Sequence, residues 1–180
     1  KTTPDKFSEA MKKLGSLISQ DIHKLVEEFG DKIDEIIDNK RDYLIDYFGF
    51  KTLERSYLLK IGGRVVERPQ YMYMRVAVGI CNGDVQMALR IYDDLSQHFY
   101  THATPTLFNA GTPHPQYASC FLLGTEDSVD GILHTNNSIA TISRYGGGIG
   151  LHINNWRSTG SYIRGTGGIS NGIVPFLQMY

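Results

Sequence analysis

Glycines and arginines gather in the last third of the chain in a pattern that suits binding of an anion. The run from Tyr145 to Gly150 holds four glycines, and Arg144, Arg157 and Arg164 are the only basic residues after Arg90. Backbone N–H groups of glycine approach an anionic ligand closely, and guanidinium groups bind phosphate through paired hydrogen bonds. These residues suit a phosphorylated small molecule; the alternative is a glycine turn that only reverses the chain, flanked by ordinary surface arginines.

The glycine run does not match the standard nucleotide-binding motifs. A Rossmann fingerprint follows a strand and opens a helix, whereas residues 145–150 are predicted to end a helix and open a strand. A phosphate-binding loop of the GxxxxGK[ST] type is excluded because Lys60 is the last lysine of the chain. Any phosphate contact in this region is therefore expected from backbone N–H groups and arginine.

Cys81 and Cys120 are the only cysteines. Two are too few for a disulfide framework, and neither stands in a CxxC or Cys/His spacing that would bind zinc. The six histidines show no metal spacing either. No metal site is predicted. Cys120 follows Ser119 in an apolar segment, and composition alone favours a buried inert thiol over a reactive one.

Composition and charge exclude several classes of protein. The 180 residues carry 18 Lys and Arg against 19 Asp and Glu, and no surplus of positive charge exists to drive binding of nucleic acid. With 41% hydrophobic and 21% charged residues, a globular fold is expected. No apolar stretch of about 18 residues predicts a membrane span, and the first residues lack the apolar core of a signal peptide. A cytoplasmic protein without a membrane partner is expected.

The first hundred residues are predicted to form amphipathic helices. Apolar residues recur at helical spacing over 7–18 and 22–29, and Asp31 is expected to cap a third helix through Ile37. Further helices are expected over 51–60, 71–81 and, capped by Asp84, 85–99, with breaks at Gly62-Gly63 and Pro69. Residues 1–60 hold 11 basic and 12 acidic side chains against 7 and 7 in residues 61–180, so the two parts are expected to do different jobs.

After Tyr100 the pattern changes to alternating strands and helices. Residues 101–116 contain three prolines and are expected to form a loop. Residues 119–123 predict a buried strand and 149–153 a second strand, separated by a helix that Asp127 or Ser128 caps. A glycine-rich loop over 154–172 and a helix from near Ile173 follow. The alternation predicts an α/β unit with parallel strands, and because a lone pair of strands cannot close a core, the chain is expected to be the front part of something larger.

Five segments of the chain are similar to those of a known enzyme family. They are Tyr47–Tyr57 (YFGFKTLERSY), Thr104–Thr112 (TPTLFNAGT), Ser119–Leu123 (SCFLL), Gly147–Gly150 (GGIG) and Arg157–Ile163 (RSTGSYI). In this order and spacing the chain closely resembles the large, catalytic subunit of class I ribonucleoside-diphosphate reductase, from about Tyr43 to the end. The resemblance implies an α/β fold in which an N-terminal helical region is followed by the first strands of a ten-stranded α/β barrel, incomplete in this chain.

By this resemblance the chain has three parts. Residues 1–42 are a weakly matched helical segment, 43–116 are the N-terminal helical domain of the large subunit, and 117–180 are the start of the catalytic barrel. The family's N-terminal ATP-cone has no counterpart in residues 1–42.

The resemblance also implies a chemistry for Cys120. The family removes the 2′-hydroxyl of ribonucleotides through a thiyl radical, and Cys120 matches one of two cysteines that supply the reducing electrons and close to a disulfide in each turnover. The second redox cysteine and the radical cysteine lie downstream of Tyr180. Thr104 and Ser119 match positions that hold the substrate by hydroxyl or backbone contacts, and Gly148 matches a position that lines the same pocket.

A second site implied by the resemblance binds an allosteric effector, a deoxynucleoside triphosphate or ATP, at a dimer interface. Its matched residues are Asp127, Ser128 and Val129 toward the nucleoside, with Arg144, Arg157 and the Arg164-Gly165 loop toward the base or phosphates. Arg144 stands where the family commonly has lysine and Arg164 where a small residue is common, so either is expected to alter effector preference.

Partners and cofactors follow from the same resemblance. The partners are the ribonucleoside diphosphate substrate, a small subunit whose dinuclear metal centre supplies the radical, the rest of the large subunit in cis or in trans, and a second large subunit in a homodimer. Thioredoxin or glutaredoxin is the expected reductant, and this segment itself binds no cofactor directly and is expected to be inactive alone. Two alternatives stay open: a non-catalytic nucleotide-binding regulatory module, and a cobalamin-dependent ribonucleotide reductase.

Overall fold

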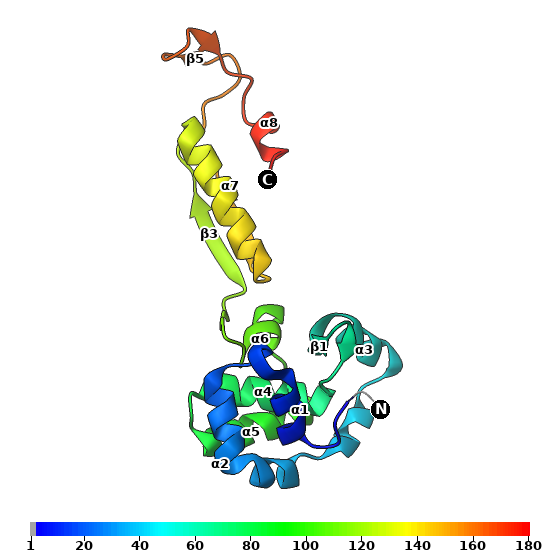
Figure 1. Ribbon diagram of the computed structural model, residues 1–180. Helices are drawn as coiled ribbons and strands as arrows, with labels where there is room; N and C mark the ends of the chain where they lie inside the picture. The colour runs from blue at the N-terminus through cyan, green and yellow to red at the C-terminus, as the bar shows by residue number, and fades with distance from the viewer. Residues whose placement is uncertain (1–2) are drawn as a thin grey trace. The chain divides into compact units, whose positions relative to one another are not determined.

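A computed structural model describes residues 3–180, which form two compact units that divide after Tyr117 (Figure 1). Unit 1, up to Tyr117, is almost entirely helical. Unit 2, Ala118–Tyr180, holds the two parallel strands. The predicted fold class is confirmed, since a helical region is followed by a few strands that belong to an α/β arrangement and the sheet is not closed within residues 3–180.

Unit 1 consists of short helices and one small hairpin. Its α-helices are α1 (Phe7–Leu14), α2 (Gln20–Ile36), α3 (Tyr47–Thr52), α4 (Pro69–Cys81), α5 (Val85–Ser96) and α6 (Thr104–Asn109). Two 3₁₀-helices, η1 (Gly15–Leu17) and η2 (Asn39–Leu44), and the π-helical turn η3 (Leu53–Tyr57) lie between them. Strand β1 (Lys60–Ile61) pairs antiparallel with β2 (Arg64–Val65).

Helix α4 forms the centre of the unit 1 core. Tyr71, Met72, Met74, Val76 and Ala77 are all completely buried, so successive positions face protein on every side of the helix. Helix α5 packs along α4, and apolar side chains of α1 and α2 complete the core. Burying each large apolar side chain contributes about 1.5–3 kcal/mol relative to leaving it exposed, which explains why α4 carries apolar residues on all sides rather than on one face.

A buried ion pair links α4 to the hairpin and to α6. Arg75 Nε lies 2.6 Å from Glu67 Oε1, and neither side chain has any exposed surface. The Arg75 guanidinium also donates to the carbonyl oxygens of Ala110, at 2.6 Å, and Leu107, at 3.2 Å. Glu67 Oε2 accepts a 3.1 Å hydrogen bond from Leu59 N. Three segments distant in sequence are therefore joined through one pair of charges.

Several predicted helix boundaries in unit 1 are wrong. Asp31 caps no helix, because α2 runs through Gly30 to Ile36 without interruption. The helix expected over 51–60 begins earlier, at Tyr47, and ends as a π-helical turn at Tyr57, so that Lys60 already belongs to a strand. Pro69 does not break the chain but opens α4, where the missing proline N–H would have no helical partner.

The region expected to be a loop over 101–116 contains helix α6. Pro105 lies in the first turn of α6, where proline is tolerated because its nitrogen needs no intrahelical acceptor.

The cap predicted for helix α5 is confirmed, although its predicted end is not. Asp84 accepts a hydrogen bond from Met87 N at the start of α5, as predicted, and Phe99 lies beyond the end of that helix.

Unit 2 starts with a strand, a helix and a second strand. Strand β3 (Cys120–Gly124) pairs in parallel with β4 (Gly148–His152), and α7 (Val129–Arg144) connects them, as the alternation predicted. Phe121, Leu123, Ile149 and Leu151 are half-buried, and helix α7 lies against this face of the strands. The opposite face is exposed, so the expectation that residues 119–123 form a buried strand is wrong for the described chain.

The rest of unit 2 contains a hairpin and a short helix. Strand β5 (Tyr162–Ile163) pairs antiparallel with β6 (Gly168–Ile169), within the segment predicted to be only a loop. Helix α8 (Val174–Leu177) follows with Pro175 in its first turn, as predicted. Two-residue strands carry too little hydrophobic alternation for a sequence pattern to reveal them.

Candidate functional site

Cys120 begins β3 and lies beside a glycine of the neighbouring strand. In the parallel register Cys120 pairs with Gly148, and Leu122 pairs with Gly150. Alternate residues of a strand point to the same face, so Cys120 and Leu122 share the face that α7 does not cover. Cys120 is exposed and Leu122 is 89% exposed. The alternative of a buried, inert thiol therefore does not hold for Cys120 in the described chain.

Glycine at positions 148 and 150 means that β4 adds no side chain to this face beside Cys120 and Leu122. A Cβ atom on Gly148 would lie 3.1 Å from the carbonyl oxygen of Ser119, and one on Gly150 would lie 2.8 Å from Leu122 Cδ2. Gly148 N also donates a 2.8 Å hydrogen bond to Ser119 O. Three of the predicted substrate and redox residues, Ser119, Cys120 and Gly148, thus lie together where the two strands begin. A ligand can approach the thiol over the glycine side of the strand pair.

Thr104, the fourth predicted residue of this group, is the first residue of α6 in unit 1. Its Oγ1 lies 2.9 Å from the hydroxyl oxygen of Tyr57. The sequence singled out Thr104 but gave no indication that Tyr57, 47 residues earlier, is its neighbour. The contact depends on the packing of η3 against α6, which a sequence pattern does not reveal.

A second group of predicted residues lines a cavity of about 290 Å³ in unit 2. Ser128 caps α7, because its Oγ accepts a 3.0 Å hydrogen bond from Gly131 N. Arg157 Nε donates to Asp127 Oδ2 at 2.7 Å, and Arg157 Nη2 donates to the Asp127 carbonyl oxygen at 3.2 Å. Together with Val129 these residues form one wall of the cavity, so the structure brings four of the predicted effector residues together.

The ion pair in this cavity leaves hydrogen-bonding capacity unused. Asp127 and Arg157 are both half-buried. Within residues 3–180, Asp127 Oδ1 and Arg157 Nη1 have no hydrogen-bond partner. A carboxylate oxygen accepts from a sugar hydroxyl and a guanidinium N–H donates to a phosphate or a base acceptor, so the pair can contact neighbouring donor and acceptor groups of a nucleotide.

Trp156 and Ser170 are among the residues of the cavity wall that sequence reasoning missed. Trp156 is 8% exposed and packs edge-on against Phe176, with ring centroids 5.8 Å apart. The Trp156 indole N–H has no acceptor among the described residues. Ser170 is buried, and its Oγ accepts a 3.0 Å hydrogen bond from Gly172 N. The one available signal was that Trp156, the sole tryptophan of the chain, directly precedes Arg157.

The other three predicted effector residues do not line this cavity. Arg144 is the last residue of the 16-residue helix α7, which places it about 22 Å from Val129, the first residue. Its guanidinium lies over the ring of Tyr145, 5.6 Å from the centroid. Arg164 and Gly165 are exposed in the turn between β5 and β6, next to Ile163, which does line the cavity.

Cys81 contrasts with Cys120. It ends α4 and is partly buried. Burial raises the pKa of its thiol above the ordinary value, and the nearby Asp84 carboxylate acts in the same direction. A reactive cysteine needs the opposite, a readily formed thiolate. The electrostatics therefore agree with leaving Cys81 out of the predicted redox chemistry.

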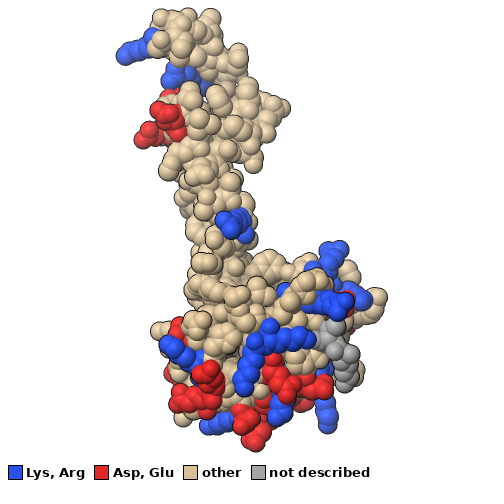
Figure 2. All heavy atoms as spheres, viewed as in Figure 1, with Lys and Arg blue, Asp and Glu red and all other residues tan. Residues whose placement is uncertain are grey.

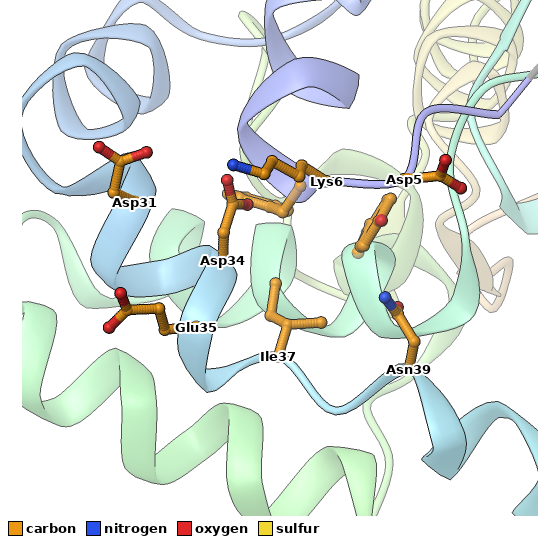
Figure 3. Close-up of a pocket in the computed structure, with 9 residues that line it drawn as sticks. Asp5, Lys6, Asp31, Asp34, Glu35, Ile37 and Asn39 are labelled. Carbon is orange, nitrogen blue, oxygen red and sulfur yellow. The ribbon is translucent and has the colours of Figure 1, made fainter.

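Unit 1 also contains an acidic hollow of about 420 Å³ (Figure 3). Asp5, Asp31, Asp34 and Glu35 contribute side chains to it. Asp34 accepts hydrogen bonds from Ser8 N at 2.9 Å and Ser8 Oγ at 2.6 Å, and these bonds fasten α1 to α2. In residues 3–180 no three His, Cys, Asp or Glu side chains are grouped to hold a metal ion, and no helix is both long and apolar enough to span a membrane.

Comparison with known families covers both units. Residues 43–115 match the family described as ribonucleotide reductase, all-alpha domain, and residues 118–180 match ribonucleotide reductase, barrel domain. The chain belongs to the ribonucleotide reductase large-subunit family. The open strand pair around Cys120 thus lies within the barrel-domain match, and α4 to α6 lie within the all-alpha-domain match.

Individual similar proteins are named as large subunits of ribonucleoside-diphosphate reductase. The chain is 51% identical over 177 residues to ribonucleoside-diphosphate reductase large chain 2 of Saccharomyces cerevisiae, covering 98% of this chain and 20% of the relative. It is 50% identical over 192 residues to the large subunits of Arabidopsis thaliana and Monkeypox virus, covering all of this chain and 24% and 25% of those relatives. This reductase chain therefore spans about a fifth to a quarter of the length of these relatives.

Proposed function

We propose that the chain is part of the large subunit of an enzyme that reduces ribonucleoside diphosphates to deoxyribonucleotides for DNA synthesis. The observation that carries the proposal is the position of Cys120, exposed at the start of β3 and paired with Gly148 on the open face of two parallel strands. The names of the relatives support the reductase over a non-catalytic regulatory module or a cobalamin-dependent enzyme.

In the proposed reaction the ribose 2′-hydroxyl leaves as water. Cys120 and a second cysteine outside residues 1–180 supply the two electrons and two protons and close to a disulfide. A radical cysteine, also outside these residues, is activated by a small subunit with a dinuclear metal centre. Thioredoxin or glutaredoxin then restores the dithiol by exchange, which requires access to the Cys120 sulfur. The segment alone is inactive because it holds only one of the reacting cysteines.

The substrate diphosphate and ribose are held by Thr104, Ser119 and Gly148. A threonine hydroxyl has one proton to donate to an anionic oxygen, and backbone groups at Ser119 and Gly148 add contacts without bulk. In this proposal residues 1–42 are the weakly matched helical segment, 43–116 the N-terminal helical domain and 117–180 the start of the barrel. The rest of the large subunit follows in cis or joins in trans, and the enzyme works in the cytoplasm.

The effector, a deoxynucleoside triphosphate or ATP, occupies the 290 Å³ cavity of unit 2. Asp127, Ser128 and Val129 contact its nucleoside, and Arg157 with the Arg164-Gly165 loop contacts its base or phosphates. Arg144 contributes from the second large subunit of a homodimer, because α7 holds it about 22 Å from Val129 of its own chain.

The test of the redox role is Cys120→Ser in the assembled enzyme with a dithiol reductant. Multiple-turnover reduction of CDP should be lost, because serine cannot form a disulfide. Cys81→Ser is the matched control and should keep turnover, since Cys81 ends helix α4 of unit 1 and matches none of the reacting cysteines. Normal turnover of Cys120→Ser would refute the assignment.

A further inference from the structure

Tyr57 contacts one side of helix α6 through both its ring and its hydroxyl. The hydroxyl oxygen lies 2.9 Å from Thr104 Oγ1. The tyrosine ring packs against the ring of Phe108, with centroids 4.7 Å apart and planes tilted by 44°. Thr104 and Phe108 are four residues apart in α6 and therefore lie on the same face of the helix. Tyr57 thus makes one polar and one apolar contact along this face.

The backbone on both sides of this contact is fixed. Tyr57 ends the π-helical turn η3, in which Leu58 N donates to Leu53 O at 2.9 Å, and such turns are frequent at functional sites. Directly after it, Leu59 N is held by Glu67. The partner of Glu67 in the buried ion pair, Arg75, holds the last carbonyls of α6. The segment after Tyr57 and the C-terminal end of α6 are therefore both hydrogen-bonded to the buried pair of Glu67 and Arg75.

We infer that Tyr57 is a positioning residue that orients the Thr104 hydroxyl toward the substrate, an inference that rests on the proposed function. The Thr104 hydroxyl has a single proton, and the oxygens of an ionised diphosphate only accept hydrogen bonds. If Thr104 donated its proton to Tyr57, none would remain for the substrate. With Tyr57 as the donor, the Thr104 proton is free for a phosphate oxygen. Consecutive hydrogen bonds of this kind also strengthen one another.

The first test is Tyr57→Phe in the full-length large subunit assembled with its small subunit. This variant keeps the ring on Phe108 and removes only the hydroxyl. The KM for CDP should rise roughly three- to tenfold, the range expected for one neutral hydrogen bond, while kcat stays within about twofold. Tyr71→Phe is the matched control: its hydroxyl donates to Pro4 O rather than to α6, so KM should not change. An unchanged KM in Tyr57→Phe would overturn the inference.

A double-mutant cycle separates this inference from the proposed function. Thr104→Val should raise the KM for CDP, whereas Thr104→Ser, which keeps a hydroxyl, should leave KM near that of the unaltered enzyme. Adding Tyr57→Phe to Thr104→Val should not raise KM further. A further rise in KM in the double variant would show that Tyr57 acts independently of Thr104, and would overturn the inference. An unchanged KM in Thr104→Val would instead refute the substrate role of Thr104, and with it the inference drawn from that role.

Discussion

At the scale of single residues, accessibility distinguishes the two cysteines of the chain. Cys120 is exposed beside a strand that carries glycine at the paired position. Cys81 is partly buried, and its pKa is raised by burial and by Asp84. A dithiol reductant must reach a sulfur atom to exchange with it. Of the two cysteines in the described residues Cys120 is the more accessible, which is why the redox proposal depends on its position rather than on the number of thiols.

Among the proposed effector residues, Arg157 is the one whose loss has the clearest expected result. Arg157→Ala should weaken binding of the effector triphosphate by about 1–3 kcal/mol, because a charge-assisted contact is lost and Asp127 is left without its cationic partner. Equilibrium binding of a deoxynucleoside triphosphate to the large subunit measures the effect. Arg90→Ala, which removes an exposed arginine of α5, is the control and should bind normally. Equal affinity for both variants would remove Arg157 from the site.

At the scale of elements, the buried pair of Arg75 and Glu67 is expected to dominate the stability of unit 1. Arg75→Met should lower the free energy of unfolding by about 3–5 kcal/mol, since Glu67 is left as a buried carboxylate without a positively charged partner. The double variant Arg75→Met/Glu67→Gln should lose less than Arg75→Met alone, because no uncompensated charge remains. Urea denaturation followed by circular dichroism measures both. A larger loss in the double variant would contradict this account of the pair.

His102, between α5 and α6, should make stability depend on pH. Burial lowers the pKa of its imidazole below the ordinary value of 6.5. As pH falls through 6.5 the unfolded chain binds a proton before the folded chain does, so this contribution to stability is present above pH 6.5 and lost below it.

His102→Asn should therefore show a smaller fall in melting temperature between pH 7.5 and 5.5 than the unaltered chain. His114→Asn, which replaces an exposed histidine of the same unit, should keep the original pH dependence. If the melting temperatures of the His102 variant and the unaltered chain fall equally between pH 7.5 and 5.5, the contribution of His102 is refuted. Thermal scans at a series of pH values provide the comparison.

The elements of this fold were predictable where the signal is local. The Asp84 cap, the helices α1, α4 and α7 and the parallel strand pair follow from spacing, capping and alternation. Helix α6 was missed because three prolines in 101–116 suggested a loop, although Pro105 occupies the one turn that tolerates it. The open face of β3 was missed because an apolar strand predicts burial without saying which part of the protein covers it.

In the candidate sites too, residues that are adjacent in sequence could be predicted together, whereas contacts between distant segments could not. Asp127 and Ser128 are adjacent to the start of α7 and were found together with it. Arg157 reaches Asp127 from 30 residues away, and only the resemblance to the reductases placed the two in one site. Nothing in the sequence pattern shows that Trp156 is buried in the same cavity or that Tyr57 contacts Thr104, since both facts depend on packing between distant segments.

At the scale of the whole molecule, charge is divided unequally between the two units. Figure 2 shows Lys, Arg, Asp and Glu crowded over unit 1 and sparse over the visible face of unit 2. Residues 118–180 contain six charged side chains: Glu126, Asp127, Asp130, Arg144, Arg157 and Arg164. Four of these six are predicted effector residues. A surface with so few charges makes each one a strong local determinant of where an anionic ligand binds.

The length of α7 leads to a prediction about the assembled enzyme. Arg144 and Arg157 are both assigned to the effector, yet within one chain Arg144 lies about 22 Å from the end of α7 at which Arg157 binds Asp127. Both assignments hold only if each effector is bound by Arg157 of one subunit and Arg144 of the other. A large subunit lacking Arg144 should then complement one lacking Arg157.

Mixed dimers of Arg144→Ala and Arg157→Ala subunits test this arrangement. One of the two effector sites in such a dimer would combine the two unaltered arginines, and the other would lack both. Differently tagged subunits, purified as the mixed dimer and titrated calorimetrically with effector, should bind one molecule per dimer with unaltered affinity, whereas each dimer of a single variant binds weakly at both sites. Weak binding at both sites of the mixed dimer would place Arg144 and Arg157 in the same subunit's site, which the length of α7 does not allow without a large rearrangement of unit 2.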